Sequence, residues 1–474
     1  MLSTLRRSRS RLAVIAAAAA GIACFAGAST TVYAADEPFA RVPRGAAYQV
    51  INGFGSSSRV MNDPHVFDVN GPAPAMTRAQ QDAVLNALYV ELGLTRIRPI
   101  QPETAAGSPP FGIEVSNDNS SPTVTDPARF NFAGRRLDDH AAHVVRAKAR
   151  GVTVAWMSPL NREPWMGVSA GTNDVGEYAE WLLAQVRRFR DRGARLAYIS
   201  VANEPSYSRN SMSGAFIRDV IKALGPRLRA EGLLAPFVVP DDLDPSVAAT
   251  QASIVLADPV ARRYVGALAT HLYGDSLDEL AAMRSLARRY SLPLWMTESA
   301  LGVVSSLRKR TAVPLDWALL MHDLLTRYDV SAIDYFWGYI GVRDAVQSSL
   351  IQLEHDGKTY RGFTRTKVFY YFGQYSRFVR PGARRVAVTS SNRSVKASAY
   401  YRGRTRTVVV LNPGTAAART TLRAADLVGV RRMTQTRTTP TENWAKRRTV
   451  SVSGRSVVVT LPPQSVVTLT GVAG

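Results

Sequence analysis

The sequence predicts a (β/α)8 barrel, also called a TIM barrel, followed by an antiparallel β domain. Apolar runs alternate with amphipathic stretches from about residue 50 to residue 380, which is the pattern of a parallel sheet covered by helices. Beyond residue 380 short runs alternate apolar and polar residues between turn signals, which indicates antiparallel strands. With 474 residues, 46% of them hydrophobic, the chain is long enough to build a large core.

Eight apolar runs are typical of buried barrel strands. They are VINGFGS (50–56), LTRIRPI (94–100), VTVAWMS (152–158), LAYISVAN (196–203), PFVVP (236–240), YVGALATHLY (264–273), LPLWMTES (292–299) and SAIDYFWG (331–338). Helical patterns separate them, among them TRAQQDAVLNALYVEL, for which Thr77 is the expected N-cap, and VGEYAEWLLAQVRRFRDRG, which ends at Gly193. We read residues 338–353, after the eighth strand, as a loop.

The expected organisation has four parts. Residues 1–34 form a signal peptide, residues 35–50 add a strand to the side domain, residues 51–380 form the barrel, and residues 381–474 form a β-sandwich. Seven runs support the last part: RVAVTSS, VKASAYYR, RTRTVVVLN, RRMTQTRTT, RTVSVSG, RSVVVTLPP and SVVTLTGV. No Gly/Ser linker separates barrel and side domain, so we expect them to fold together.

The N-terminal segment predicts export. Four arginines precede the apolar stretch LAVIAAAAAGIACFAGA: Arg6, Arg7, Arg9 and Arg11. The sequence Val32-Tyr33-Ala34 fits the small-residue cleavage rule. We expect cleavage after Ala34 and a secreted protein without membrane attachment; an uncleaved anchor is the alternative. The only cysteine, Cys24, lies in this segment, so a mature chain would have no disulfide and no thiol chemistry.

The formal net charge of +22 would favour acidic partners such as nucleic acid or acidic polysaccharides. The basic residues are spread along the chain, however, and form neither a tail nor a nucleic-acid motif. We therefore interpret the charge as an arginine-rich solvated surface and expect no nucleic-acid partner.

Two glutamates end predicted strands. Glu204 follows the fourth strand in YISVANEPSY, and Glu298 lies at the end of the seventh in LPLWMTES. The carboxyl ends of barrel strands carry the active sites of this fold, and strands four and seven face each other across the mouth. Two opposed carboxylates suit hydrolysis of a glycosidic bond. The structural alternatives are a loop-capping Glu204 and a Glu298 that pairs with an arginine.

Ordered motifs make the chain resemble glycoside hydrolase family 30. They are INGFGSS, GLTRIRP, ISVANEPSY, HLYG, LWMTES, YYFGQYSRFVRPGARRV and LPPQSVVTLTG. The resemblance covers most of the chain beyond the signal peptide. It implies a barrel with a β side domain, a retaining mechanism and no cofactor.

The resemblance also implies roles for individual residues. Glu204 would be the acid/base and Glu298 the nucleophile. Asn203 would hold the 2-hydroxyl of the sugar, Arg98 and Tyr273 would contact the nucleophile, and Trp337 would form an apolar floor. Substrate contacts would also come from Trp165 and His271. For Trp337 and Tyr273, packing at the top of the barrel is the structural alternative.

One motif departs from the family. The segment SPLNREPWMG after the third strand has Leu160 where family members have a tryptophan, which leaves the substrate more open than the reaction. The polar loop VSNDNSS (115–121) lacks the full calcium-loop pattern, so the sequence predicts no metal.

We expect an endo-acting enzyme for a β-linked polysaccharide: glucuronoxylan, β-1,6-galactan or β-1,6-glucan. Uronic acids on the polymer would suit the basic chain, and Arg343 is a candidate to pair with them; a solvent-facing Arg343 is the alternative. Other hypotheses are an exo-acting β-glycosidase, a glucosylceramidase-like hydrolase, and a non-catalytic basic protein that binds glycans.

Overall fold

The computed structural model describes residues 48–100, 112–166, 175–207, 211–233, 235–273, 276–300, 313–341 and 349–474. The signal-peptide prediction and residues 35–47 of the predicted N-terminal strand lie outside these ranges. Among the helices of these ranges, none is both long enough and apolar enough to cross a bilayer.

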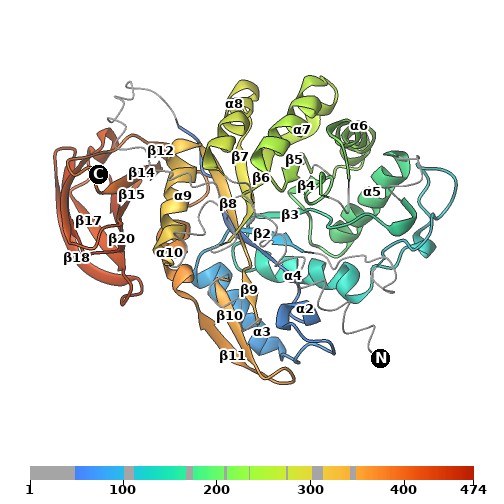
Figure 1. The fold of residues 1–474 in the computed structure, drawn as a ribbon, viewed down its shortest axis with the longest axis horizontal. Helices are drawn as coiled ribbons and strands as arrows, with labels where there is room; N and C mark the ends of the chain where they lie inside the picture. Colours follow the sequence, from blue (N-terminus) through green and yellow to red (C-terminus); the bar gives the residue numbers. More distant parts are fainter. Residues whose placement is uncertain are drawn as a thin grey trace, which may run out of the picture.

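A closed parallel barrel confirms the predicted fold class (Figure 1). All eight predicted strands are present, including the short fifth one, and the last pairs with the first. The strands are β1 (Gly53–Ser58), β2 (Arg96–Pro99), β3 (Val154–Met157), β4 (Tyr198–Ser200), β5 (Phe237–Asp242), β6 (Val265–His271), β7 (Leu294–Ser299) and β8 (Val330–Phe336). Their burial on both faces explains the near-continuous apolar runs.

Helices surround the barrel. They are α2 (Pro64–Phe67), α3 (Arg78–Leu85), α4 (Asp138–Lys148), α5 (Val175–Asp191), α6 (Gly214–Ala230), α7 (Pro245–Ala257), α8 (Leu280–Tyr290), α9 (Leu315–Arg327) and α10 (Lys367–Ser376). Thr77 caps α3 with a capping box that includes Gln80, as expected. The same helical run then widens into a π-helix over Asn86–Glu91, which the sequence pattern did not indicate.

Two arginines of β2 face the barrel interior at different heights. Alternation along a strand puts Arg96 and Arg98 on the same face. Arg96 makes two hydrogen bonds of 2.9 Å to Asp334 on β8, and both residues are fully buried. Gly55 on β1 leaves room for this pair, because a side chain there would overlap Asp334. Arg98, two residues further along, reaches the mouth of the barrel.

The C-terminal residues form one nine-stranded antiparallel sheet in the order β12-β14-β15-β20-β17-β18-β19-β16-β13. Its strands are β12 (Arg384–Val386), β13 (Thr389–Ser390), β14 (Lys396–Arg402), β15 (Thr405–Asn412), β16 (Ala418–Arg423), β17 (Arg432–Thr438), β18 (Ala445–Ser453), β19 (Ser456–Leu461) and β20 (Ser465–Val472). Residues from both halves of the sheet share one core, so the sheet curls on itself. Among these strands, β16 was missed, although its residues alternate between buried and exposed.

Residues 338–353 are not wholly a loop, which corrects the sequence interpretation. They contribute to a small sheet of β9 (Tyr339–Ile340), β10 (Ile351–His355) and β11 (Tyr360–Arg365). Asp356 and Gly357 lie between β10 and β11, and Gly357 has a φ of 93°. An Asp-Gly pair is a strong hairpin signal that the interpretation overlooked.

The side domain packs directly on the barrel helices. In Figure 1, α9 and α10 lie between the barrel and the red C-terminal sheet. The Tyr371 hydroxyl donates to the Gln464 carbonyl (3.0 Å), and the Trp444 indole donates to the Tyr370 carbonyl (2.7 Å). At the entrance to the barrel, Ile51 and Ala383 are joined by a backbone hydrogen bond of 2.8 Å.

The packing of this interface predicts that adding one methyl group at Gly373 lowers the stability of the protein. At Gly373 on α10 an added Cβ would overlap the ring of Trp444. We expect Gly373→Ala to lower the free energy of unfolding by about 1–3 kcal/mol through overpacking, although alanine is the better helix former. Urea unfolding measures the change. Gly71→Ala is the control, because no atom lies within 4 Å of its added Cβ; equal stability of the two variants would contradict the prediction.

Candidate active site

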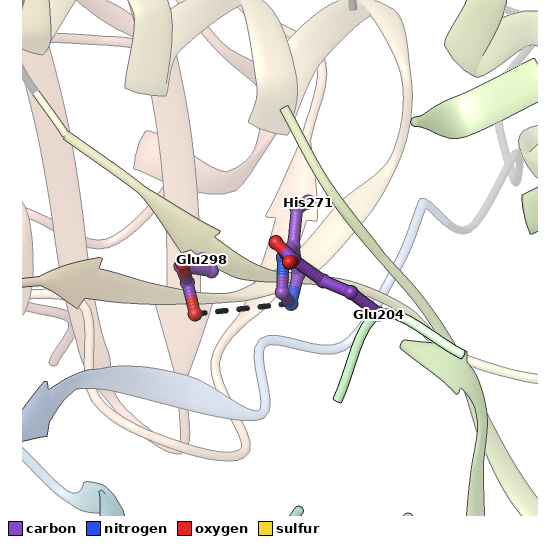
Figure 2. A group of neighbouring side chains, drawn as sticks. All are labelled: Glu204, His271 and Glu298. Carbon is purple, nitrogen blue, oxygen red and sulfur yellow. Dashed lines mark hydrogen bonds and ion pairs between the residues drawn. The ribbon is translucent and has the colours of Figure 1, made fainter. Parts of the chain in front are cut away.

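Glu204 and Glu298 approach each other at the carboxyl ends of β4 and β7. One oxygen of each carboxylate and one ring nitrogen of His271 lie within 4.8 Å of one another. Figure 2 shows the two glutamates on either side of the His271 ring. The side chains of Glu204 and Glu298 are 15% and 9% exposed. The short separation is that of retaining glycosidases, which hold their carboxyl groups about 5–5.5 Å apart.

The backbone at Glu204 is held in an unusual conformation. Its φ is 46°, in the left-handed region that few residues other than glycine adopt. Two hydrogen bonds fix it: Glu204 N donates to the Asp241 carbonyl, and Tyr207 N donates to the Glu204 carbonyl, both at 2.9 Å. Such strained positions cluster at functional sites. Strand β4 ends at Ser200, and the chain turns sharply at Glu204, four residues later.

Glu298 is held by two donors. Arg98 Nη1 lies 2.6 Å from Glu298 Oε2, and the Tyr273 hydroxyl donates to Oε1 at 2.8 Å. A buried guanidinium and a hydroxyl hydrogen bond both stabilise a carboxylate in its ionised form. Arg98 is itself 1% exposed, so this ion pair is shielded from solvent. These two contacts therefore favour the anionic form of Glu298 and fix the orientation of its carboxylate group.

The surroundings of Glu204 differ from those of Glu298. Burial raises the pKa of its carboxyl above the ordinary value; hydrogen bonding to His271 and the charge of that residue oppose the rise, and the nearby charge of Glu298 adds to it. Glu204 Oε1 lies 2.9 Å from His271 Nδ1. A carboxyl whose pKa is raised keeps its proton at higher pH, as a general acid must.

His271 connects the two glutamates to a third acid. Its ring is fully buried, with Nε2 at 3.3 Å from Asp241 Oδ1 and 4.0 Å from Glu298 Oε2. Burial alone would lower the pKa of His271, but Glu298, Asp241 and Glu204 outweigh burial and raise it to about 10. His271 therefore acts as a buried cation that positions Glu204. The resemblance had implied that this residue contacts the substrate.

Asp241 is the site residue that the sequence interpretation missed. It is the penultimate residue of β5, is fully buried, and lies 3.4 Å from Arg98 Nη2 and 2.6 Å from the Ser158 hydroxyl. Burial would raise its pKa, but Arg98, His271 and Ser158 hold the pKa of this carboxyl well below its usual range. A signal existed: the acidic pair in VVPDD stands at the carboxyl end of a strand, like both glutamates.

Of the eight predicted site residues, six form one connected network. Asn203 completes it, since its side-chain oxygen accepts a hydrogen bond from Arg98; the other five are Arg98, Glu204, His271, Tyr273 and Glu298. Trp337 and Trp165 are placed differently. The ring of Trp337 stacks on Phe336 with centroids 4.0 Å apart, and the Trp165 indole donates to the Glu114 carbonyl at 2.7 Å. Within the described ranges no hydrogen bond joins either indole to the two glutamates.

Comparison with known proteins finds two glycosidases to which the chain is similar in sequence. No family model matches the chain. It is 26% identical over 300 residues to the glucuronoxylanase XynC of Bacillus subtilis, covering 62% of this chain and 66% of that protein. It is 27% identical over 256 residues to an endo-1,6-β-D-glucanase of Neurospora crassa, covering 48% and 49%. The chain thus spans less than two thirds of each relative.

Solved structures support the fold. The catalytic domain of the GH30 xylanase C from Talaromyces cellulolyticus has a TM-score of 0.72 at 22% identity, and the alignment covers 90% of this chain and 98% of that one. A GH30 endoxylanase from Clostridium papyrosolvens has a TM-score of 0.68 at 24% identity, with the same coverage. Together with the ordered motifs, these comparisons confirm the resemblance of the chain to glycoside hydrolase family 30.

Proposed function

We propose that this protein is a retaining β-glycosidase in which Glu298 is the nucleophile and Glu204 the acid/base. The main support is that one carboxylate oxygen of Glu204 and one of Glu298 lie within 4.8 Å of each other in a largely buried mouth. The surroundings of the two carboxylates differ. Arg98 and Tyr273 hold Glu298 as an anion. Burial and the charge of Glu298 favour a proton on Glu204.

The reaction has two steps. In the first, an oxygen of Glu298 bonds to the anomeric carbon while the bond to the leaving oxygen breaks, and the Glu204 proton moves to that oxygen. In the second, a water oxygen attacks the same carbon, its proton moves to Glu204, and the ester to Glu298 breaks. Two inversions restore the β-configuration. Arg98 and Tyr273 keep Glu298 aligned throughout.

Charge balance supports this division of roles. With Glu204 protonated, the cations Arg98 and His271 balance the anions Glu298 and Asp241. Ionising Glu204 would add an uncompensated negative charge beside Glu298, which is unfavourable in a site shielded from water. The network therefore opposes the exchange of roles between the two glutamates.

Removing each carboxyl group tests the roles. We expect Glu298→Ala to abolish turnover, and azide with an activated aryl β-glycoside to give an inverted α-glycosyl azide. Glu204→Ala should still react with that substrate, whose leaving group needs little protonation, and azide should give a retained β-glycosyl azide. On a polymer, Glu204→Ala should lose roughly 100-fold or more in rate. NMR of the glycosyl azide products gives their anomeric configuration. A β-product from Glu298→Ala and an α-product from Glu204→Ala would mean that the two roles are exchanged.

For the substrate, we propose endo-cleavage of an extracellular, plant-type β-glycan, with glucuronoxylan ahead of β-1,6-glucan and β-1,6-galactan. The two sequence relatives are named for glucuronoxylan and for β-1,6-glucan. The net charge of +22, or +18 without the four arginines of the predicted signal peptide, would attract a polymer that carries uronic acids. Secretion through residues 1–34 is part of this proposal. Arg343, the candidate uronate partner, lies outside the described residues.

Chemical reduction of the uronic acids on glucuronoxylan tests this choice. Their removal should lower the initial rate at least tenfold, or about 1.4 kcal/mol, if a charged contact contributes to transition-state binding. Product analysis on β-1,6-glucan and β-1,6-galactan is the parallel measurement, and mixed oligosaccharides rather than single sugars indicate endo-cleavage. Equal rates on native and reduced glucuronoxylan would refute the proposal that uronic acids are recognised. The β-1,6-linked polymers would then be the favoured substrates.

A further inference from the structure

A second group of carboxylates lies apart from the two glutamates of the proposed reaction. Asp118 belongs to the segment that follows β2, and Glu177 and Glu180 lie on the first turns of α5. Their spacing of three residues puts Glu177 and Glu180 on the same helix face. One carboxylate oxygen of each of the three residues lies within 4.8 Å of the others.

The burial of Glu180 is the independent observation. This residue is 1% exposed, and neither of its carboxylate oxygens accepts a hydrogen bond from the described residues. Burial raises the pKa of Glu180, and the Thr125 hydroxyl opposes this rise without completing a hydrogen bond of ordinary geometry. Asn117 Oδ1 and Asp118 Oδ1 are also shielded from solvent and lack a hydrogen bond. A buried carboxylate without a partner costs several kcal/mol, so these oxygens call for a ligand.

Nearby arginines do not supply that partner. Arg187 donates twice to Glu231, at 2.9 and 2.7 Å, and once to Thr125. Arg227 donates to the Pro122 carbonyl at 2.9 Å. Neither forms an ion pair with Glu180 within the described ranges.

We propose that Asp118, Glu177 and Glu180 bind a calcium ion, with the Asn117 side-chain oxygen as a further ligand. Calcium takes oxygen ligands at 2.3–2.6 Å, so two oxygens on one ion are at most about 5 Å apart. The separation within 4.8 Å fits this limit. The donor set consists of oxygens, which favours a hard cation over zinc. Magnesium is the weaker candidate, because it demands near-ideal octahedral geometry and retains several waters.

The ion would tie the segment after β2 to α5, and hydrogen bonds connect that segment to Trp165. Glu114 Oε1 accepts from Asp118 N at 2.9 Å, and the Glu114 carbonyl accepts from the Trp165 indole at 2.7 Å. Glu163 Oε1 accepts from Ile113 N at 2.6 Å. The cation would thus be structural: it would position Trp165, a candidate sugar-binding surface, without touching substrate. The proposal does not depend on the reaction proposed above.

Calcium titration of the chelator-treated full-length protein tests the proposal. We expect heat of binding for about one equivalent of CaCl2, and a rise in Tm of roughly 5 °C at saturating calcium over EDTA. Magnesium should give a smaller shift. The absence of both binding heat and a Tm shift would overturn the proposal, whatever the activity on glycans.

Variants locate the ion. Glu180→Gln should lose the calcium-dependent shift and, in EDTA, should melt no lower than the wild type, because it removes a buried unpaired charge. Glu354→Gln, at an exposed position on β10, is the control and should keep the full shift. If Glu180→Gln does not fold, Asp118→Asn serves the same purpose. A full calcium response in a folded Glu180→Gln or Asp118→Asn protein would place the ion elsewhere and refute the site.

Discussion

Two carboxyl groups that meet in a largely buried mouth cannot both be ionised cheaply, and the rest of the site is arranged around this constraint. Glu204 and Glu298 lie within 4.8 Å of each other, where like charges repel strongly because little water screens them. Arg98 and Tyr273 stabilise the charge on Glu298. The proposed reaction therefore assigns the proton to Glu204. His271 and Asp241 form a buried ion pair. Its opposite charges cancel, so it keeps the total charge of the site near zero.

The barrel supplies the positions that this arrangement needs. Residues at the carboxyl ends of several strands converge on one mouth, so residues in or shortly after β2, β4, β5, β6 and β7 meet without any local motif that joins them. Strand β2 contributes twice. Arg96 fills the interior with Asp334, and Arg98, on the same face one step higher, reaches Glu298. The C-terminal sheet packs against α9 and α10, the helices that flank β8 in the chain, and thereby supports one side of the barrel.

Sequence alone predicted the barrel strands and the glutamate pair because both leave local signals. A buried strand is a continuous apolar run, and a polar residue that interrupts it at the carboxyl end is conspicuous. Asp241 shows where this reasoning stopped: the predicted fifth strand ended at residue 240, and only the fold shows that Asp241 faces Arg98 and His271. The π-helix at Asn86–Glu91 left no such signal. The carboxylates of Asp118, Glu177 and Glu180 come from segments far apart in the chain, so no local metal motif marks them.

The central claim is that Glu204 holds a proton because Glu298 is charged, and titration of the carboxyl carbons by NMR tests it most directly. In protein labelled with 13C at the glutamate carboxyl carbon, the resonance lost in Glu204→Gln identifies Glu204. We predict that it titrates above the ordinary glutamate value of about 4.3 and moves to lower pH in Glu298→Gln, which removes the neighbouring charge. A Glu204 that titrates in the ordinary range, or that does not respond to Glu298→Gln, would contradict the account.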